Sequence, residues 1–230
     1  MAAITHATDE HGHGHEEGLH HQFEDMEQQS ETYLVGMWSF LVSEVMFFGA
    51  MFLAYTLYRW KYQPDFHAAH EELSVLWGGI NTTVLLFSSF TMVMGVHFAQ
   101  LRKKDWVIRM LGATIVCAFV FLIIKFTQEW PVKFEHHLFP GANFGTEGHL
   151  NGANPKAAEL FYSLYFAMTG FHALHIIVGI LLLGVLAMLW KKENPLVTKD
   201  YIPTELIGLY WHFVDLVWIF LFPLFYLIPS

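Results

Sequence analysis

Two pairs of ionisable side chains lie within long apolar segments in the C-terminal half of the chain. His212 and Asp215 are three residues apart in the run Gly-Leu-Tyr-Trp-His-Phe-Val-Asp-Leu-Val-Trp, and His172 and His175 have the same spacing in an earlier segment. Residues three apart lie above one another on one face of an α-helix. An ionised group at mid-membrane costs at least about 2.5–3.5 kcal/mol, so such residues usually face the protein interior and have a role there.

These side chains suit proton transfer or metal ligation. A hydrogen bond between Asp215 and His212 would satisfy both groups and lower the cost of burying them. His172, His175 and His212 could instead ligate a haem or a metal ion. We favour the first interpretation, because ligand histidines usually have dedicated outer-shell partners that the sequence does not reveal. Neither His-Glu-x-x-His nor Cys-x-x-Cys-His occurs in the chain, and we expect no catalytic centre and no metal site in it.

Glu44 is a further carboxyl in an apolar segment, within Trp-Ser-Phe-Leu-Val-Ser-Glu-Val-Met-Phe-Phe. Burial in hydrocarbon favours the uncharged form of such a group. It could relay protons, or it could anchor a lipid or a partner helix. It could equally be a neutral side chain that bonds to a neighbouring helix of the same protein. The residues alone leave these alternatives open.

The remaining polar candidates favour structural roles. Lys125 and Glu129 have the i, i+4 spacing of an ion pair near the outer membrane interface, where Lys125 could extend its charge towards water. Asn81 is predicted to make an interhelical hydrogen bond. Trp211 and Trp218 flank the His212–Asp215 pair, and aromatic residues in this position more often form packing surface than a cofactor site.

The elements that hold these residues are membrane helices. The chain has 230 residues, of which 54% are hydrophobic and 14% are charged, whereas soluble domains have about 25% charged residues. Several apolar runs are long enough to cross a bilayer. We therefore predict an all-α polytopic membrane protein, a bundle of five transmembrane helices with a polar N-terminal tail. The predicted spans are 34–58, 75–100, 107–128, 158–190 and 204–228.

The chain divides into a tail, residues 1–33, and a membrane domain, residues 34–230. The tail is acidic, has no Lys or Arg, and is expected to be flexible. Its histidines could bind a transition metal, but a solvated acidic tail without fixed geometry is the stronger interpretation. These histidines are His6, His11, His13, His15, His20 and His21.

Charge in the links predicts the orientation. Basic residues concentrate in links 101–106 and 191–203, whereas links 59–74 and 129–157 have fewer. Since cytoplasmic loops carry the excess of Lys and Arg, the N-terminus is predicted to be cytoplasmic and the C-terminus periplasmic or extracellular. No cleavable signal peptide is visible at the N-terminus.

Three motifs in the same order resemble subunit III of cytochrome c oxidase. They are Ser-Glu-Val-Met-Phe-Phe from Ser43, Thr-Gly-Phe-His-Ala-Leu-His from Thr169, and Tyr-Trp-His-Phe-Val-Asp-Leu-Val-Trp from Tyr210. The resemblance covers about residues 34–228. It differs from the longest family members in having five spans instead of seven, as in the short bacterial form.

The resemblance implies a non-catalytic subunit of a haem-copper terminal oxidase in the aerobic electron transport chain. The haems and copper would reside in partner subunits I and II, with subunit I in direct contact. The chain itself would bind no cofactor except phospholipids, would stabilise the catalytic subunit and would support proton uptake. Residues matching the family's intramembrane polar set are Glu44, His172, His175, His212 and Asp215. Membership of a larger respiratory supercomplex is a further possibility, and nucleic acid is not an expected partner.

Other functions compete with this one. The equivalent subunit of a quinol oxidase is the nearest alternative, although Ser43-Glu44 favours the cytochrome c enzyme, because quinol oxidases often have Ser-Asp there. A nitric oxide reductase accessory protein is a third option. A stand-alone proton-coupled transporter would be expected to show internal repeats or broken helices, which the sequence lacks. A haem-binding membrane cytochrome would use His172, His175 and His212.

Overall fold

In the computed structural model, residues 26–141, 144–145, 152–198 and 200–227 are described, and this part of the chain contains helices and no strands. The prediction of an all-α fold is confirmed. The helices are α1 (Met26–Lys61), α2 (Gln63–His70), α3 (Val75–Gln100), α4 (Lys104–Ile124), the π-helix η1 (Lys125–Glu129), α5 (Trp130–Glu135), α6 (Pro155–Lys191), α7 (Pro195–Thr198) and α8 (Ile202–Tyr226).

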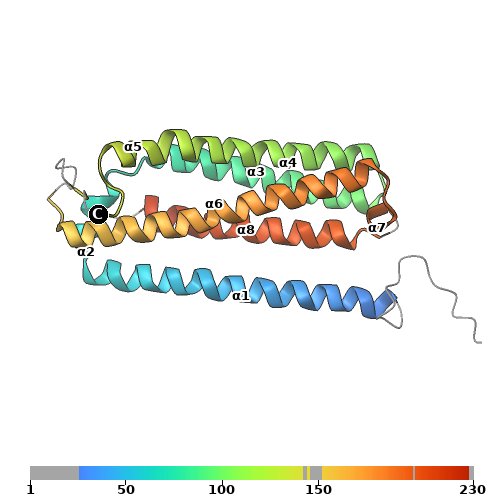
Figure 1. Cartoon of the computed structure of the whole chain (residues 1–230), viewed down its shortest axis with the longest axis horizontal. Helices are drawn as coiled ribbons and strands as arrows, with labels where there is room; N and C mark the ends of the chain where they lie inside the picture. Colours follow the sequence, from blue (N-terminus) through green and yellow to red (C-terminus); the bar gives the residue numbers. More distant parts are fainter. Residues whose placement is uncertain (1–25, 142–143, 146–151, 199, 228–230) are drawn as a thin grey trace, which may run out of the picture.

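Five helical segments within the described residues are long and apolar enough to cross a membrane, as predicted. Helices α3, α4, α6 and α8 pack together, and α1 runs along one side of this group (Figure 1). In the most apolar part of each helix, 17% of the residues are buried in α1 and 44% in α8. Helix α1 is therefore a peripheral element, and α8 is the most enclosed.

The observed helices extend beyond the predicted spans. Helix α1 begins at Met26, so that residues 26–33 are helical although we assigned them to the tail. The third span continues through η1 and α5 to Glu135, well into the predicted link 129–157. Both helices are longer than predicted for the same reason: each continues into polar residues beyond the apolar stretch from which it was predicted. The histidines of the tail, His6 to His21, lie outside the described residues.

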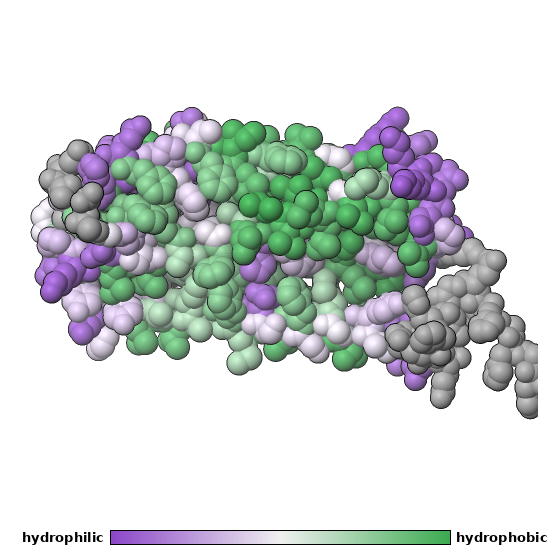
Figure 2. Space-filling model, viewed as in Figure 1, coloured by the Kyte–Doolittle hydropathy of each residue, from purple (hydrophilic) through white to green (hydrophobic). Residues whose placement is uncertain are grey.

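Apolar side chains cover the outside of the bundle. On the face shown in Figure 2, a broad hydrophobic belt covers most of the middle, and polar residues gather towards both ends. Exposed members include Met46 and Leu181, which are 71% and 65% accessible. A soluble monomer rarely exposes so much contiguous apolar surface. The belt therefore suits contact with lipid or with other membrane subunits.

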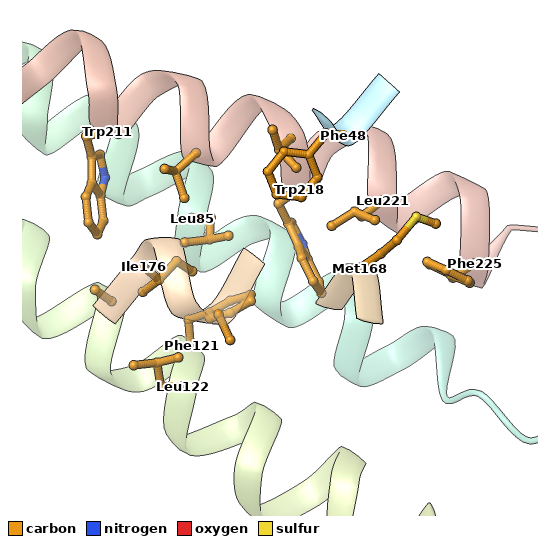
Figure 3. Close-up of a cluster of buried hydrophobic side chains, with 14 of the residues drawn as sticks. Phe48, Leu85, Phe121, Leu122, Met168, Ile176, Trp211, Trp218, Leu221 and Phe225 are labelled. Carbon is orange, nitrogen blue, oxygen red and sulfur yellow. The ribbon is translucent and has the colours of Figure 1, made fainter. Parts of the chain in front are cut away.

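Tryptophans organise the core between α8 and its neighbours. Trp211 and Trp218 point from α8 into the centre, where Leu85, Phe121 and Ile176 also lie (Figure 3). The indole N–H of Trp211 donates to Ser88 Oγ, and that of Trp218 donates to Thr82 Oγ1, both at 3.0 Å. Each large ring is thus fixed to α3 by a hydrogen bond as well as by packing, as buried tryptophans usually require.

Helix α2 covers the end of the bundle where α8 terminates. The Nδ1 atom of half-buried His70 lies 2.9 Å from the Phe225 carbonyl oxygen, to which it can only donate. Burial lowers the pKa of His70, and this outweighs the effect of the hydrogen bond to Phe225, which raises it. The folded protein therefore favours the neutral imidazole more strongly than the unfolded chain does.

This pKa shift predicts a pH dependence of stability. The contribution of His70 is complete above the ordinary histidine pKa of about 6.5 and is lost as the pH falls below it. The thermal unfolding midpoint should therefore fall as the pH is lowered below about 6.5. His70→Gln should make this fall less steep. His97→Gln, at the opposite end of the bundle, is the control and should retain the slope. An identical slope in His70→Gln and the parent protein would contradict this assignment.

Candidate functional site

Glu44 and His175 form a polar contact between α1 and α6. The Glu44 Oε2 and His175 Nε2 atoms are 3.2 Å apart, and both side chains are largely buried. The other ring nitrogen, Nδ1, lies 2.7 Å from the Phe171 carbonyl oxygen, one turn earlier in the same helix. Glu44 thus bonds to a neighbouring helix of the same protein, one of the alternatives that the sequence left open.

The Phe171 carbonyl fixes the proton arrangement of this pair. A carbonyl oxygen only accepts, so Nδ1 of His175 carries a proton and donates it. The 3.2 Å contact of Nε2 with Glu44 is then favourable in two arrangements: an unprotonated Nε2 facing a neutral carboxyl, or a protonated Nε2 facing a carboxylate. The net charge of the two side chains is zero in both cases. This neutrality is what makes the pair acceptable within the membrane-spanning region.

An apolar groove adjoins the Glu44–His175 pair. It lies between the N-terminal half of α1 and helices α6 and α8, with a volume of about 410 Å³. Its walls include Met37 and Phe40 of α1, Leu182 of α6 and Ile207 of α8. His175 lines the groove as well, so the pair stands at its edge.

His212 and Asp215 do not bond to each other as the sequence suggested. The Nδ1 atom of His212 lies 2.8 Å from Ser89 Oγ on α3. The Asp215 carboxyl is 3% exposed, and within the described chain neither of its oxygens has hydrogen-bond geometry to a partner, although the Ser89 hydroxyl lies beside it. The predicted hydrogen bond between Asp215 and His212 is therefore wrong, because the His212 side chain is directed towards the Ser89 hydroxyl of α3.

His172 occupies an aromatic environment. Its ring lies 5.1 Å from the Trp218 ring and meets the Phe121 ring edge-on at 5.6 Å. It is 1% exposed, and neither ring nitrogen finds a hydrogen-bond partner among the described residues. His172 and His175, one turn apart on α6, therefore have different surroundings.

Lys125 and Glu129 form an ion pair, as predicted, but the pair lies in the interior. The Nζ and Oε2 atoms are 2.6 Å apart, and both side chains are 1% exposed. The predicted extension of Lys125 towards water was therefore wrong. The two residues begin and end the π-helix η1, whose wider turn changes the direction of the side chains relative to an α-helix.

Two tyrosines bond to the ion pair of Lys125 and Glu129. Tyr165 of α6 donates to Glu129 Oε2 at 2.9 Å, and Tyr226 of α8 donates to the same oxygen through a short hydrogen bond. Lys125 also donates to the Tyr226 hydroxyl at 2.8 Å and lies over the Trp218 ring. We call Lys125, Glu129, Tyr165 and Tyr226 the ionic cluster. It joins η1, α6 and α8 near one end of the bundle.

Further residues support the ionic cluster. Asn81 of α3 donates to Glu129 Oε1 at 3.4 Å, a long and therefore weak hydrogen bond that agrees with its predicted interhelical role. Lys133, also buried, donates to the Glu129 backbone carbonyl at 3.1 Å. Lys133, Tyr165 and Tyr226 were not predicted as site residues from the sequence. The i, i+4 spacing of Glu129 and Lys133 was an available signal, whereas the tyrosines become conspicuous only once they lie opposite Glu129.

The histidines do not form a shared ligand set. His172 packs on Trp218, His175 bonds to Glu44, and His212 bonds to Ser89. Across the described ranges, no three His, Cys, Asp or Glu side chains are placed to hold a metal ion. The arrangement can share protons between pairs of side chains and can hold helices together.

The model of the cytochrome c oxidase subunit III family matches residues 17–230 of the chain. The chain belongs to this family. The matched region includes the five helical segments that are long and apolar enough to cross a membrane. The polar residues named above lie within the matched region.

Individual relatives include subunits of two oxidase types. This subunit III is 31% identical to cytochrome c oxidase subunit 3 of Synechocystis sp., over 85% of the chain and 75% of the relative. It is 30% identical to quinol oxidase subunit 3 of Bacillus spizizenii, over 86% of the chain and 89% of the relative. It is also 28% identical to the haem-copper oxidase subunit I+III of Aeropyrum pernix, of which it covers 22%. The chain is therefore a haem-copper oxidase subunit III, and association with subunit I follows.

Proposed function

We propose that this subunit III is a non-catalytic subunit of a cytochrome c oxidase, which stabilises subunit I and supports proton uptake. The observation that carries the proposal is the use of its buried polar groups. Glu44 pairs with His175, His212 with Ser89, and Lys125 with Glu129, so that each contact joins side chains of this chain instead of converging on a cofactor. The haems and copper then belong to subunits I and II.

The apolar groove supports phospholipid binding. Its volume of about 410 Å³ lies within the range of about 300–1,000 Å³ that is common for ligand sites. Its walls are apolar except for the Glu44–His175 edge, which suits an acyl chain. A lipid in this position would fill the space between α1 and the other helices and thereby hold α1 in place.

The electron donor distinguishes the two oxidase types. Ser43-Glu44 favours cytochrome c as donor, whereas the similarity to a quinol oxidase subunit makes quinol the second candidate. We further propose a bacterial inner membrane location with a cytoplasmic N-terminus, which the basic links and the bacterial relatives support. Membership of a supercomplex is compatible with the exposed apolar face of α1.

Purification through an affinity tag on this chain tests the proposal. Subunits I and II should co-purify, and subunit II should contain a copper-binding domain if cytochrome c is the donor. The complex should show haem absorbance and should oxidise reduced cytochrome c. A haem absorbance that remains with this chain after separation from its partners would contradict a non-catalytic role, and oxidation of quinol alone would favour the second candidate.

A substitution at Glu44 tests the support of proton uptake. Glu44→Ala leaves His175 without its Nε2 partner, so the oxidase should lose activity faster during turnover than the parent enzyme. Ser43→Ala is the matched control, because the Ser43 hydroxyl bonds only to a backbone carbonyl of its own helix among the described residues. Unchanged activity, proton pumping and inactivation rate in Glu44→Ala would remove Glu44 from the proposed function.

A further inference from the structure

A second cavity lies between α3 and α8 and differs in character from the apolar groove. Its volume is about 360 Å³, and four of its eight lining residues have polar side chains. They are His97 and Gln100 at the end of α3, Glu205 in the first turn of α8, and His212 further along α8. The cleft therefore begins at the membrane face that carries the basic link 101–106 and runs into the bundle.

Gly208 lies in the wall of this cleft where α3 and α8 approach each other closely. A Cβ atom at this position would lie 2.9 Å from Val96 Cγ2 and 3.3 Å from Met92 Cε. Any larger residue would push the two helices apart or fill the space between them. The absence of a side chain at Gly208 therefore allows α3 and α8 to pack closely and leaves the cleft beside them open.

His212 forms the inner part of the cleft wall. Its Nδ1 atom bonds to Ser89 Oγ at 2.8 Å, and its Nε2 atom makes no hydrogen bond to the described residues. The Ser89 hydroxyl lies beside the carboxyl of Asp215. Asp215 is about 20 Å along α8 from Ile202 at 1.5 Å per residue, and it is buried without a partner of hydrogen-bond geometry in the described chain.

A buried carboxyl without such a partner is costly and calls for an explanation. The thiol of Cys117 on α4 also lies close to Asp215. Neither an ion pair nor a metal site accounts for Asp215 within that part of the chain. The feature that does connect to it is the polar cleft, through His212 and Ser89.

We propose that the cleft between α3 and α8 contains water and exchanges protons between one membrane face and Asp215. A hydronium ion that enters through this water gives a proton to Nε2 of His212 and becomes a water molecule, and the Nδ1 proton passes to Ser89 Oγ. The Ser89 hydroxyl proton then passes to an Asp215 carboxylate oxygen. His212 ends neutral with its other nitrogen protonated, Ser89 is unchanged, and Asp215 has gained one proton. The purpose of this exchange rests on the proposed role in proton uptake, whereas the route itself does not.

Water access can be measured by thiol labelling of the assembled oxidase. In a Cys117→Ala background, Leu209→Cys places a thiol in the cleft wall, and Val185→Cys places one on the exposed apolar face of α6. Leu209 is seven residues from the start of α8 at Ile202, and Val185 is six residues from the end of α6 at Lys191, so both lie about 10 Å from the same end of the bundle at 1.5 Å per residue. A charged, membrane-impermeant methanethiosulfonate should label Leu209→Cys at least about tenfold faster, because charged reagents do not enter hydrocarbon readily.

Equally slow labelling of the two thiols would overturn the proposal, since it would show a dry cleft. If Leu209→Cys prevents assembly, Val93→Cys on the opposite wall of the cleft replaces it with the same expectation. A complex that labels as expected but pumps protons normally in Asp215→Asn would contradict the role in proton uptake and leave the water-filled cleft supported. The two ideas therefore fail on different measurements.

Infrared spectroscopy tests the route to Asp215. The Asp215 carboxyl signal is the one that Asp215→Asn removes, and transfer to heavy water should shift it as its proton is exchanged. Ser89→Ala removes the hydroxyl between His212 and Asp215 and should slow this exchange at least about tenfold, within the range by which a positioned proton donor acts. Ser43→Ala, on α1, should leave it unchanged. Equal exchange rates in Ser89→Ala and the parent, or no exchangeable Asp215 signal at any pH, would overturn the route.

Discussion

Glu129→Gln is expected to lower the free energy of unfolding of this subunit by about 3–5 kcal/mol, the cost of leaving a buried charge without its partner. Lys125 Nζ lies 2.6 Å from the Glu129 carboxylate and is 1% exposed. The substitution keeps the shape of the side chain and removes only its charge. Lys125 would then remain charged in the interior, or would have to lose its proton.

The loss should appear as a lower thermal midpoint and a lower yield of assembled oxidase. The double variant Lys125→Met/Glu129→Gln removes both charges and should recover a large part of the loss, because an apolar replacement of a buried ion pair is often nearly neutral. Lys104→Gln is the control, since it breaks the exposed pair of Lys104 and Glu193 and should have little effect. Equal stability of Glu129→Gln and the parent would mean that the ionic cluster does not hold the helices together.

Gly179→Ala is expected to destabilise the bundle by about 1–3 kcal/mol, the usual effect of overpacking. A Cβ atom at Gly179 would lie 2.6 and 2.8 Å from two atoms of the Trp211 ring. This ring is fully buried and is held to α3 by its hydrogen bond to Ser88. It therefore cannot move aside without breaking that bond or displacing α6.

Gly184 in the same helix supplies the matched control. A Cβ atom there would meet nothing within 4 Å, so Gly184→Ala should leave stability unchanged or raise it by up to about 1 kcal/mol through helix propensity. Trp211→Phe combined with Gly179→Ala should recover part of the loss, because the smaller ring leaves space for the methyl group. Thermal unfolding of the purified oxidase measures all three variants. Similar midpoints for Gly179→Ala and Gly184→Ala would contradict the close approach of α6 and α8.

Most of the fold could be predicted because hydrophobicity marks membrane helices directly. The second span was predicted as 75–100 and observed as Val75–Gln100. The first and third spans were predicted too short, since their ends contain polar residues that the apolar signal does not include. A π-helix at Lys125–Glu129 has no comparable sequence signal, because it depends on how the side chains pack.

Both partners of a polar contact could be predicted only where spacing along one helix brings them together. The pair of Lys125 and Glu129 is set by spacing along the chain and was found. The contact of Glu44 with His175 joins α1 to α6, and the contact of His212 with Ser89 joins α8 to α3. Such partners are determined by the rotation of each helix about its axis, which a single sequence does not fix. His212 and Asp215 do share one helix, but among the described residues they do not bond to each other, because His212 instead contacts Ser89 of α3.

The short distance between Glu44 and His175 has a consequence for the response to membrane voltage. A proton that moves between Oε2 and Nε2 travels at most 3.2 Å, whereas the hydrocarbon core is about 30 Å thick. A charge that crosses the whole membrane gains or loses about 2.3 kcal/mol per 100 mV. For this short distance, each 100 mV therefore changes the balance of the two proton positions by no more than about 0.25 kcal/mol. This is below thermal energy. The pair would therefore keep its proton distribution as the oxidase charges the membrane, and respond to its neighbours instead of to the voltage.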